Sequence, residues 1–195
     1  MTRVRLIMLA LVAVLAMSAV AASAASAFTE FTAAEKAELK SKQKGNQTLE
    51  AKAGKATVGT ICTEVAGTGK VTSAKTIIEG TPAYKGCTTG GLASVVSNKC
   101  VFVIHITGKV DLTGEKCATI TVTSTKCVIT VTGKQTGLEK VSFENSGLNL
   151  VTTGAVGGVN FTVAEKGKAC GFETEKVEGT ATYNGVSLTE STNVK

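Results

Sequence analysis

Short runs of β-branched residues, separated by turn residues, make up most of the chain from Thr48 onward. Val, Ile and Thr favour extended strands because their branched side chains pack well on a pleated surface. The predicted strands cover Thr57–Thr63, Lys75–Glu79, Leu92–Val96, Cys100–Thr107, Ala118–Thr123, Val128–Thr132, Lys140–Phe143, Leu148–Thr152, Gly158–Val163, Gly179–Tyr183 and Val186–Thr189. Strand follows strand without an intervening helical pattern, which predicts mainly antiparallel sheets.

Alternation of apolar and polar residues indicates that several of these strands bury one face. Ala, Ile and Val alternate with threonines in 118–123, and Val, Phe and Val alternate with Asn and Thr in 159–163. The run 100–106 is apolar on both faces apart from His105, which predicts a central strand covered on both sides. Asn184-Gly185 fits a two-residue hairpin turn. We therefore predict an all-β fold, an antiparallel β-sandwich or flattened β-barrel with disulfides.

The N-terminus has the pattern of a secretory signal peptide. Arg3 and Arg5 precede an apolar run from Leu6 to Ala16, and Ala25-Ser26-Ala27 fits the small-x-small rule of signal peptidase. We expect cleavage before Phe28. No second long apolar segment follows, so we expect no membrane span after cleavage and a location that is secreted, either extracellular or at the cell surface.

The predicted organisation has three parts. Residues 1–27 are the signal peptide, 28–47 an N-terminal arm, and 48–195 a single β-domain. Within the arm, 33–43 is rich in good helix formers, so either a short helix or an irregular segment is expected there.

The basic charge of the chain comes mainly from lysine. The formal net charge is +6, and the only arginines lie in the predicted signal peptide. Arg is the usual bidentate partner of guanine and phosphate, so an Arg-free mature chain argues against a nucleic-acid partner. Scattered lysines are better explained as a solubilising surface.

An even number of cysteines in an exported chain predicts three disulfides. The six are Cys62, Cys87, Cys100, Cys117, Cys127 and Cys170. Short loops close most easily, which favours Cys87–Cys100 and Cys117–Cys127 and leaves Cys62–Cys170. Strand geometry argues against the Cys117–Cys127 bond. If 118–123 and 128–132 form a tight hairpin, both cysteines precede their strands and lie too far apart for a disulfide. Either that connection is not tight or Cys117 has another partner.

Candidate catalytic residues are few. His105 is the only histidine, and it lies in an apolar strand, whereas catalytic groups are commonly on loops. We interpret it as structural, with Asp111 in the following turn. Glu173, Glu175 and Glu178 alternate with polar residues, as on a solvated face, and do not mark a glycosidase pair. The sequence predicts no catalytic residue, no metal site and no cofactor.

Residues 66–71, Ala-Gly-Thr-Gly-Lys-Val, resemble a phosphate-binding loop only in part. Glu64 stands where that motif needs its first Gly, and Val71 stands where it needs Ser or Thr. A turn between two strands is the expected structure here. Asn46 and Asn160 begin Asn-x-Thr triplets, which accept glycans only in sources that glycosylate exported proteins by that route.

The cysteine-bearing core resembles a group of small exported bacterial proteins of unknown function. The residues that carry the resemblance are Pro82-Ala-Tyr-Lys-Gly-Cys87, Cys100-Val-Phe-Val, Cys117, Cys127-Val-Ile-Thr-Val and Val141-Ser-Phe-Glu-Asn145, within roughly residues 57–190. The resemblance implies export and an all-β fold, and it transfers no catalytic residue.

Together these features favour a non-enzymatic secreted structural or interaction protein with an unknown extracellular or cell-surface partner. Two further hypotheses stay open, a binding module for a glycan or lipid and a secreted hydrolase. A large apolar cleft, or exposed aromatics that include Tyr84 or Tyr183, would favour binding. Two facing glutamates, or His105 exposed beside a serine and an acid, would favour hydrolysis.

Overall fold

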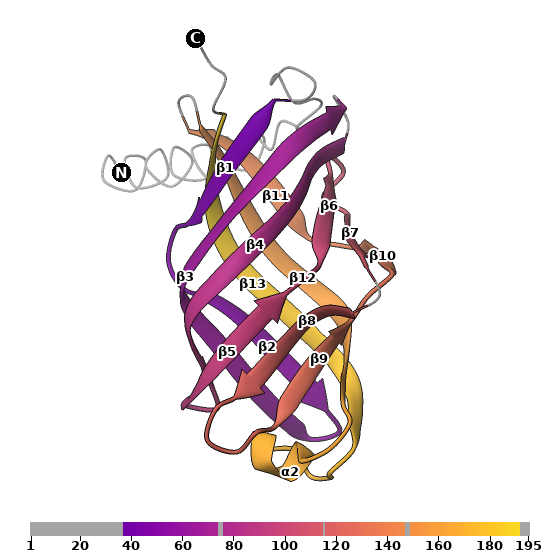
Figure 1. Cartoon of the computed structure of the whole chain (residues 1–195). Helices are drawn as coiled ribbons and strands as arrows, with labels where there is room; N and C mark the ends of the chain where they lie inside the picture. The colour runs from indigo at the N-terminus through magenta and orange to yellow at the C-terminus, as the bar shows by residue number, and fades with distance from the viewer. Residues whose placement is uncertain (1–36, 74–75, 115, 147–148, 192–195) are drawn as a thin grey trace, which may run out of the picture.

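The computed structural model describes residues 37–73, 76–114, 116–146 and 149–191 (Figure 1). The predicted signal peptide and residues 28–36 of the arm lie outside these ranges. The described chain is nearly all β, as predicted. Its strands are β1 (Glu38–Gln43), β2 (Gln47–Ala53), β3 (Ala56–Ser73), β4 (Thr76–Thr89), β5 (Leu92–Asn98), β6 (Val101–His105), β7 (Val110–Thr113), β8 (Lys116–Val122), β9 (Val128–Thr132), β10 (Gln135–Leu138), β11 (Val141–Ser146), β12 (Asn149–Val163) and β13 (Val177–Ser191), with one short helix, α2 (Gly167–Cys170), among the described residues.

Eight of these strands close into an antiparallel barrel, so the barrel form of the prediction is the one observed. Around the ring the order is β2-β3-β4-β5-β8-β9-β12-β13, and β13 pairs with β2 to complete it. Closure pairs both edges of each ring strand, which removes the exposed edges that an open sheet would leave.

Four strands, β3, β4, β12 and β13, run nearly the full length of the molecule, and the shorter strands fill the wall in two halves (Figure 1). In the lower half of that view the wall is completed by β2, β5, β8 and β9. In the upper half β1 lies between β3 and β13, β6 and β7 continue the wall from β4, and β11 pairs with β12. The sequence predicted short strands, and these four are two to three times longer.

The lower half is filled by side chains. Phe161, Ile129, Val122 and Val163 are fully buried there, and their alternation with exposed or half-buried partners confirms the predicted faces of 118–123 and 159–163. The segment with α2 covers the lower end, where Phe172 stacks on Phe161 at 5.6 Å between ring centroids (Figure 1). This end of the barrel is therefore an ordinary packed core.

All six cysteines are paired, as predicted, but the favoured pairing was wrong. The disulfides are Cys62–Cys87, Cys100–Cys117 and Cys127–Cys170. Cys62 and Cys87 are direct cross-strand neighbours on β3 and β4, a contact that loop length does not reveal. The geometric objection was right: β8 and β9 form an antiparallel hairpin, so Cys117 bonds elsewhere.

Two local predictions were also wrong. Residues 38–43 are strand β1 and not helix, because β1 fills the gap that β2 leaves between β3 and β13. Asn184-Gly185 is not a hairpin turn but the middle of β13, where Gly185 lies opposite Gly154 of β12. A Cβ at Gly185 would lie 2.9 Å from Cγ of Gln47, so glycine is needed here for close packing and not for a turn.

The side chain of Gln135 hydrogen-bonds the backbone of β12 at the point where β9 no longer pairs with it. β9 pairs with β12 only at two residues, and the chain then turns away into β10. The buried Gln135 amide donates to the carbonyl of Asn160 at 3.2 Å and accepts from the Asn160 N–H at 2.7 Å. It also donates to the carbonyl of Thr132 at 2.6 Å. One side chain thus satisfies the Asn160 N–H and the Thr132 carbonyl, and it shares the Asn160 carbonyl with the Thr132 hydroxyl of β9.

We predict that Gln135→Leu lowers the free energy of unfolding by about 1–2 kcal/mol, because the Asn160 N–H and the Thr132 carbonyl lose the hydrogen bonds of the buried Gln135 amide. Urea denaturation measures the change, and Thr136→Val at the exposed neighbour is the control, with an expected effect within about 0.5 kcal/mol. Equal midpoints for Gln135→Leu and the unaltered protein would contradict this role.

Candidate functional site

A cavity of about 190 Å³ lies inside the barrel, in the upper half and at its junction with the lower half, where Val96, Ile120 and Val131 also line it. It exists because many inward-facing positions there hold small residues. Five glycines lie on its lining, in β3, β4, β12 and β13: Gly67, Gly69, Gly80, Gly154 and Gly185. In the lower half the equivalent positions hold Val, Ile and Phe, which fill the same width.

One wall of the cavity is apolar. Phe102 and Ile104 reach it from β6, Val110 and Leu112 from β7, and Val141 from β11. These strands are short and alternate regularly, so every second side chain points inward. All five residues of β6 are half-buried, so neither face of the strand is fully covered, in contrast to the predicted central strand covered on both sides.

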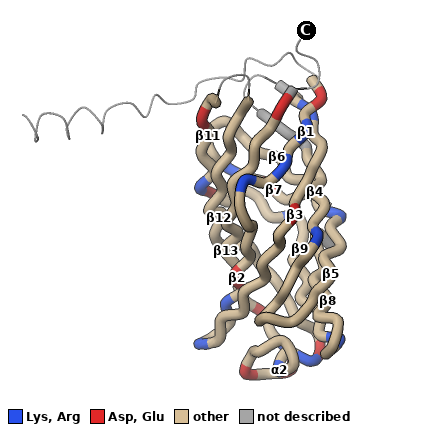
Figure 2. The backbone as a smooth tube through the Cα atoms, turned by 90° about the vertical axis from the view of Figure 1, so that its left-hand side faces the viewer, with Lys and Arg blue, Asp and Glu red and all other residues tan. Residues whose placement is uncertain are grey.

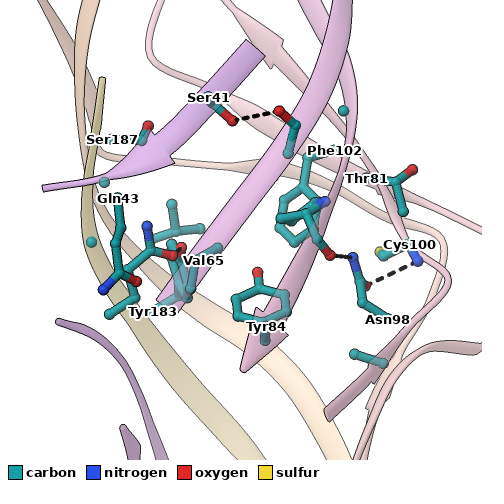
Figure 3. Close-up of a pocket in the computed structure, with 18 of the residues that line it drawn as sticks. Ser41, Gln43, Val65, Thr81, Tyr84, Asn98, Cys100, Phe102, Tyr183 and Ser187 are labelled. Atoms are coloured by element: carbon teal, nitrogen blue, oxygen red, sulfur yellow. Dashed lines mark hydrogen bonds between the residues drawn. The ribbon is translucent and has the colours of Figure 1, made fainter. Parts of the chain in front are cut away.

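The wall formed by β1 and β13 is mainly polar, and Lys42 is its charged residue. Ser41 and Gln43 line the cavity from β1, and Ser187 and Thr189 line it from β13. In Figure 3, Gln43, Ser187 and Tyr183 lie on the opposite side of the view from Phe102 and Asn98. The cavity thus has one face suited to hydrocarbon and another suited to hydrogen bonding.

Two tyrosines and a glutamine form a polar chain on the cavity wall. Tyr183 donates to Oε1 of Gln47, which is buried, and Tyr84 interacts electrostatically with Tyr183. The hydroxyls lie deep inside the barrel, where loss of water disfavours the phenolate. Burial raises the pKa of Tyr183 to about 12. Burial, and then the neighbouring Tyr183, raise the pKa of Tyr84 well above its ordinary value.

Asn98 lies on the side of the cavity away from Tyr183 (Figure 3). Its Nδ2 donates to the carbonyl of Pro82 at 2.9 Å, and its Oδ1 accepts from the N–H of Cys100 at 3.1 Å. Asn98 therefore ties the end of β5 to β4 and to the Cys100–Cys117 disulfide, whose cysteines both line the cavity.

We predict that both tyrosine hydroxyls lose their protons at a higher pH in the folded protein than in the unfolded chain. The unfolded chain loses these protons near pH 10, whereas burial raises the pKa of Tyr183 to about 12 in the folded protein and raises the pKa of Tyr84 well above its ordinary value. Folded-state pKa values above the unfolded ones mean that this stabilisation is complete below about pH 10 and is lost as the pH rises. The free energy of unfolding should fall by up to about 1.4 kcal/mol per pH unit for each tyrosine in that interval.

The ultraviolet absorbance of tyrosinate, followed during alkaline titration with and without guanidinium, measures both states. Since the chain has two Tyr and no Trp, the signal reports this site alone. Ionisation of both groups near pH 10 in the folded protein would contradict the described burial.

His105 and Asp111 are paired but belong to the outer surface of the barrel. Nε2 of His105 lies 2.8 Å from Oδ2 of Asp111, and Oδ1 of Asp111 accepts from the N–H of Gly137 at 2.7 Å. The Gly137 hydrogen bond is the main cause that lowers the pKa of Asp111, and His105 contributes. Asp111 lies in β7 and not in the predicted turn. The pair joins β6, β7 and β10 and does not line the cavity.

The remaining candidate residues do not come together in a site. Glu173, Glu175 and Glu178 are exposed, as predicted. The Gly-Thr-Gly-Lys segment at 67–70 is the middle of β3 and not a turn, so the expectation of a turn was wrong. In the view of Figure 2, lysines and acidic residues follow the length of the barrel without forming one block of a single sign.

Within the described ranges, no group of three or more His, Cys, Asp or Glu side chains is arranged to hold a metal ion. Among the same residues, no helix is long and apolar enough to cross a membrane. No protein-family model matches the chain, and neither a curated protein nor a solved structure shows significant similarity to it.

Proposed function

We propose that this protein binds a small, mainly apolar molecule inside the upper half of its barrel. The supporting observation is the cavity itself, about 190 Å³ in volume and lined largely by apolar side chains. An eight-stranded barrel is just wide enough to be filled by its own side chains or to hold one small ligand. Here the lower half is filled and the upper half is not, which favours ligand binding over a purely structural role.

Gly154 supports the same conclusion. Glycine weakens a strand interior because it adds no packing, and it is often found where a ligand or another backbone approaches closely. Gly154 has no contact nearer than 3.8 Å for an added Cβ, so packing against protein neighbours does not explain it. The open position leaves room for a ligand between β12 and the opposite wall.

Cavity size limits the ligand. An engineered apolar cavity of about 150 Å³ accommodates benzene. A cavity of about 190 Å³ suits a molecule of roughly eight to ten non-hydrogen atoms. A hydrocarbon ring with a short substituent is of this size, whereas a glycan would place many hydroxyls against an apolar wall.

Binding without catalysis is favoured by the composition of the lining. Among the described residues that line the cavity there is no carboxylate and no imidazole, and the three cysteines present there are all in disulfides. His105 and Asp111 are on the outer face of the wall. We therefore propose a non-enzymatic binding protein.

We propose further that the protein is exported and acts outside the cytoplasm. Three disulfides are compatible with an oxidising extracellular environment. The signal-like N-terminus supports the same location. N-terminal sequencing of protein secreted by its native host is expected to begin at or near Phe28; an intact Met1 form recovered from the membrane fraction would contradict export.

We predict that 2-cyclohexylethanol binds with a dissociation constant below about 1 mM, as expected for an efficient ligand of about nine non-hydrogen atoms. Both tyrosines line the cavity and the probe does not absorb with them, so tyrosine fluorescence reports binding directly. Gly154→Leu should weaken binding at least about tenfold, because its side chain fills the cavity.

Gly59→Leu is the matched control, since it places the same side chain in open space on the outer face of β3. The control should bind as the unaltered protein does, and circular dichroism checks that both variants fold. Undiminished binding by a folded Gly154→Leu variant would show that the probe binds elsewhere and would contradict the proposal.

A further inference from the structure

Three polar residues form a row across adjacent strands of the cavity wall. Gln43 of β1 pairs directly with Ser187 of β13, and Ser187 pairs directly with Thr152 of β12. All three line the cavity. Directly opposed residues on one face have Cβ atoms about 5 Å apart, so the three side chains present a continuous polar surface, here called the polar row.

Two atoms of the polar row are buried without a hydrogen-bond partner in the described structure. They are Oγ1 of Thr152 and Oε1 of Gln43. Thr152 is only 7% exposed, and the other end of the Gln43 amide is already engaged by the carbonyl of Thr63. Buried polar atoms are normally satisfied, so two unsatisfied ones on residues that line a cavity favour a polar partner that enters it.

The two atoms require complementary chemistry. Oε1 of Gln43 is an acceptor only, whereas the Thr152 hydroxyl both donates and accepts. A ligand hydroxyl can satisfy either atom, because it donates its proton to Oε1 of Gln43 or exchanges a hydrogen bond with the Thr152 hydroxyl. The remainder of such a ligand then lies toward Phe102, Ile104 and Val110 on the apolar wall.

Charge excludes an acid as the ligand. The only charged residue on the described lining is Lys42, whose side chain is 68% exposed and whose Nζ lies 3.7 Å from Oε1 of Glu190. A carboxylate at the polar row would face the Gln43 carbonyl oxygen without a cation to balance it, and desolvating it there is costly.

We infer that the ligand is a neutral alcohol, with its hydroxyl held by the polar row and its hydrocarbon part against the apolar wall. This inference rests on the proposed function and adds the chemical class of the ligand. It distinguishes a neutral alcohol from the corresponding acid and from the bare hydrocarbon.

Three probes of matched shape test it: ethylcyclohexane, 2-cyclohexylethanol and the carboxylate cyclohexylacetate. Their dissociation constants are measured by tyrosine fluorescence for the unaltered protein, Thr152→Val and Thr153→Val. Valine has nearly the shape of threonine and lacks its hydroxyl. Thr153 is the exposed neighbour on the same strand, so Thr153→Val is the matched control.

The quantity compared is the ratio of the hydrocarbon's dissociation constant to that of the alcohol. Thr152→Val should reduce this ratio by about tenfold, through weaker alcohol binding, while hydrocarbon binding is kept. Thr153→Val should leave the ratio unchanged. Cyclohexylacetate should bind at least about tenfold more weakly than the alcohol to the unaltered protein.

Ser187→Ala provides a second variant, and it should reduce the ratio in the same direction. An unchanged ratio in folded Thr152→Val and Ser187→Ala would overturn the alcohol inference while the proposed function stands. Cyclohexylacetate binding as tightly as the alcohol would also overturn it. If none of the probes binds to the unaltered protein, the proposed function itself is wrong.

Discussion

The inner width of a closed eight-stranded barrel is set by the number and tilt of its strands, so the size of the inward-facing side chains decides whether the interior is filled. In this protein the same four long strands, β3, β4, β12 and β13, pass through both halves. Along β12 the inward residues change from Thr152 and Gly154 in the upper half to Phe161 and Val163 in the lower half. The same strands therefore enclose the packed core in the lower half and the cavity in the upper half.

A barrel built in two halves needs support where strands change partners. The Gln135 amide supplies it where β9 leaves β12, by bonding both backbone groups of Asn160. The Cys100–Cys117 disulfide joins the residue before β6, in the upper half, to β8, in the lower half. Cys127–Cys170 fastens the helical cap to the start of β9. These contacts hold the lower half rigid beneath the cavity.

Much of the architecture could be predicted from local pattern. Alternation in 118–123 and 159–163 gave the correct strands and faces, and an even cysteine count in a chain with a signal-like N-terminus gave three disulfides. The class of fold follows from the same observations. What failed was the interpretation of glycine, because Gly185 and the Gly-Thr-Gly at 67–69 look like turns in sequence but serve as small inward residues in long strands.

The residues of the candidate site could not be predicted from local sequence patterns. Gln43, Ser187 and Thr152 are far apart in sequence and meet only through pairing of β1, β13 and β12. The disulfide partners were missed for the same reason, since register and not loop length brings Cys62 to Cys87. One usable signal was present: glycine, serine and threonine occupy alternate positions of 185–189, where a packed core would have apolar residues.

The upper half of the barrel contains a cavity, and one wall of this cavity is apolar. A crystal structure of the protein under xenon pressure tests this most directly, because xenon enters apolar cavities of this size. The account predicts xenon density in the upper half, beside Phe102 and Ile104 and opposite Ser187, with none in the lower half around Phe161. An upper half filled by its own side chains, with no xenon bound there, would contradict it.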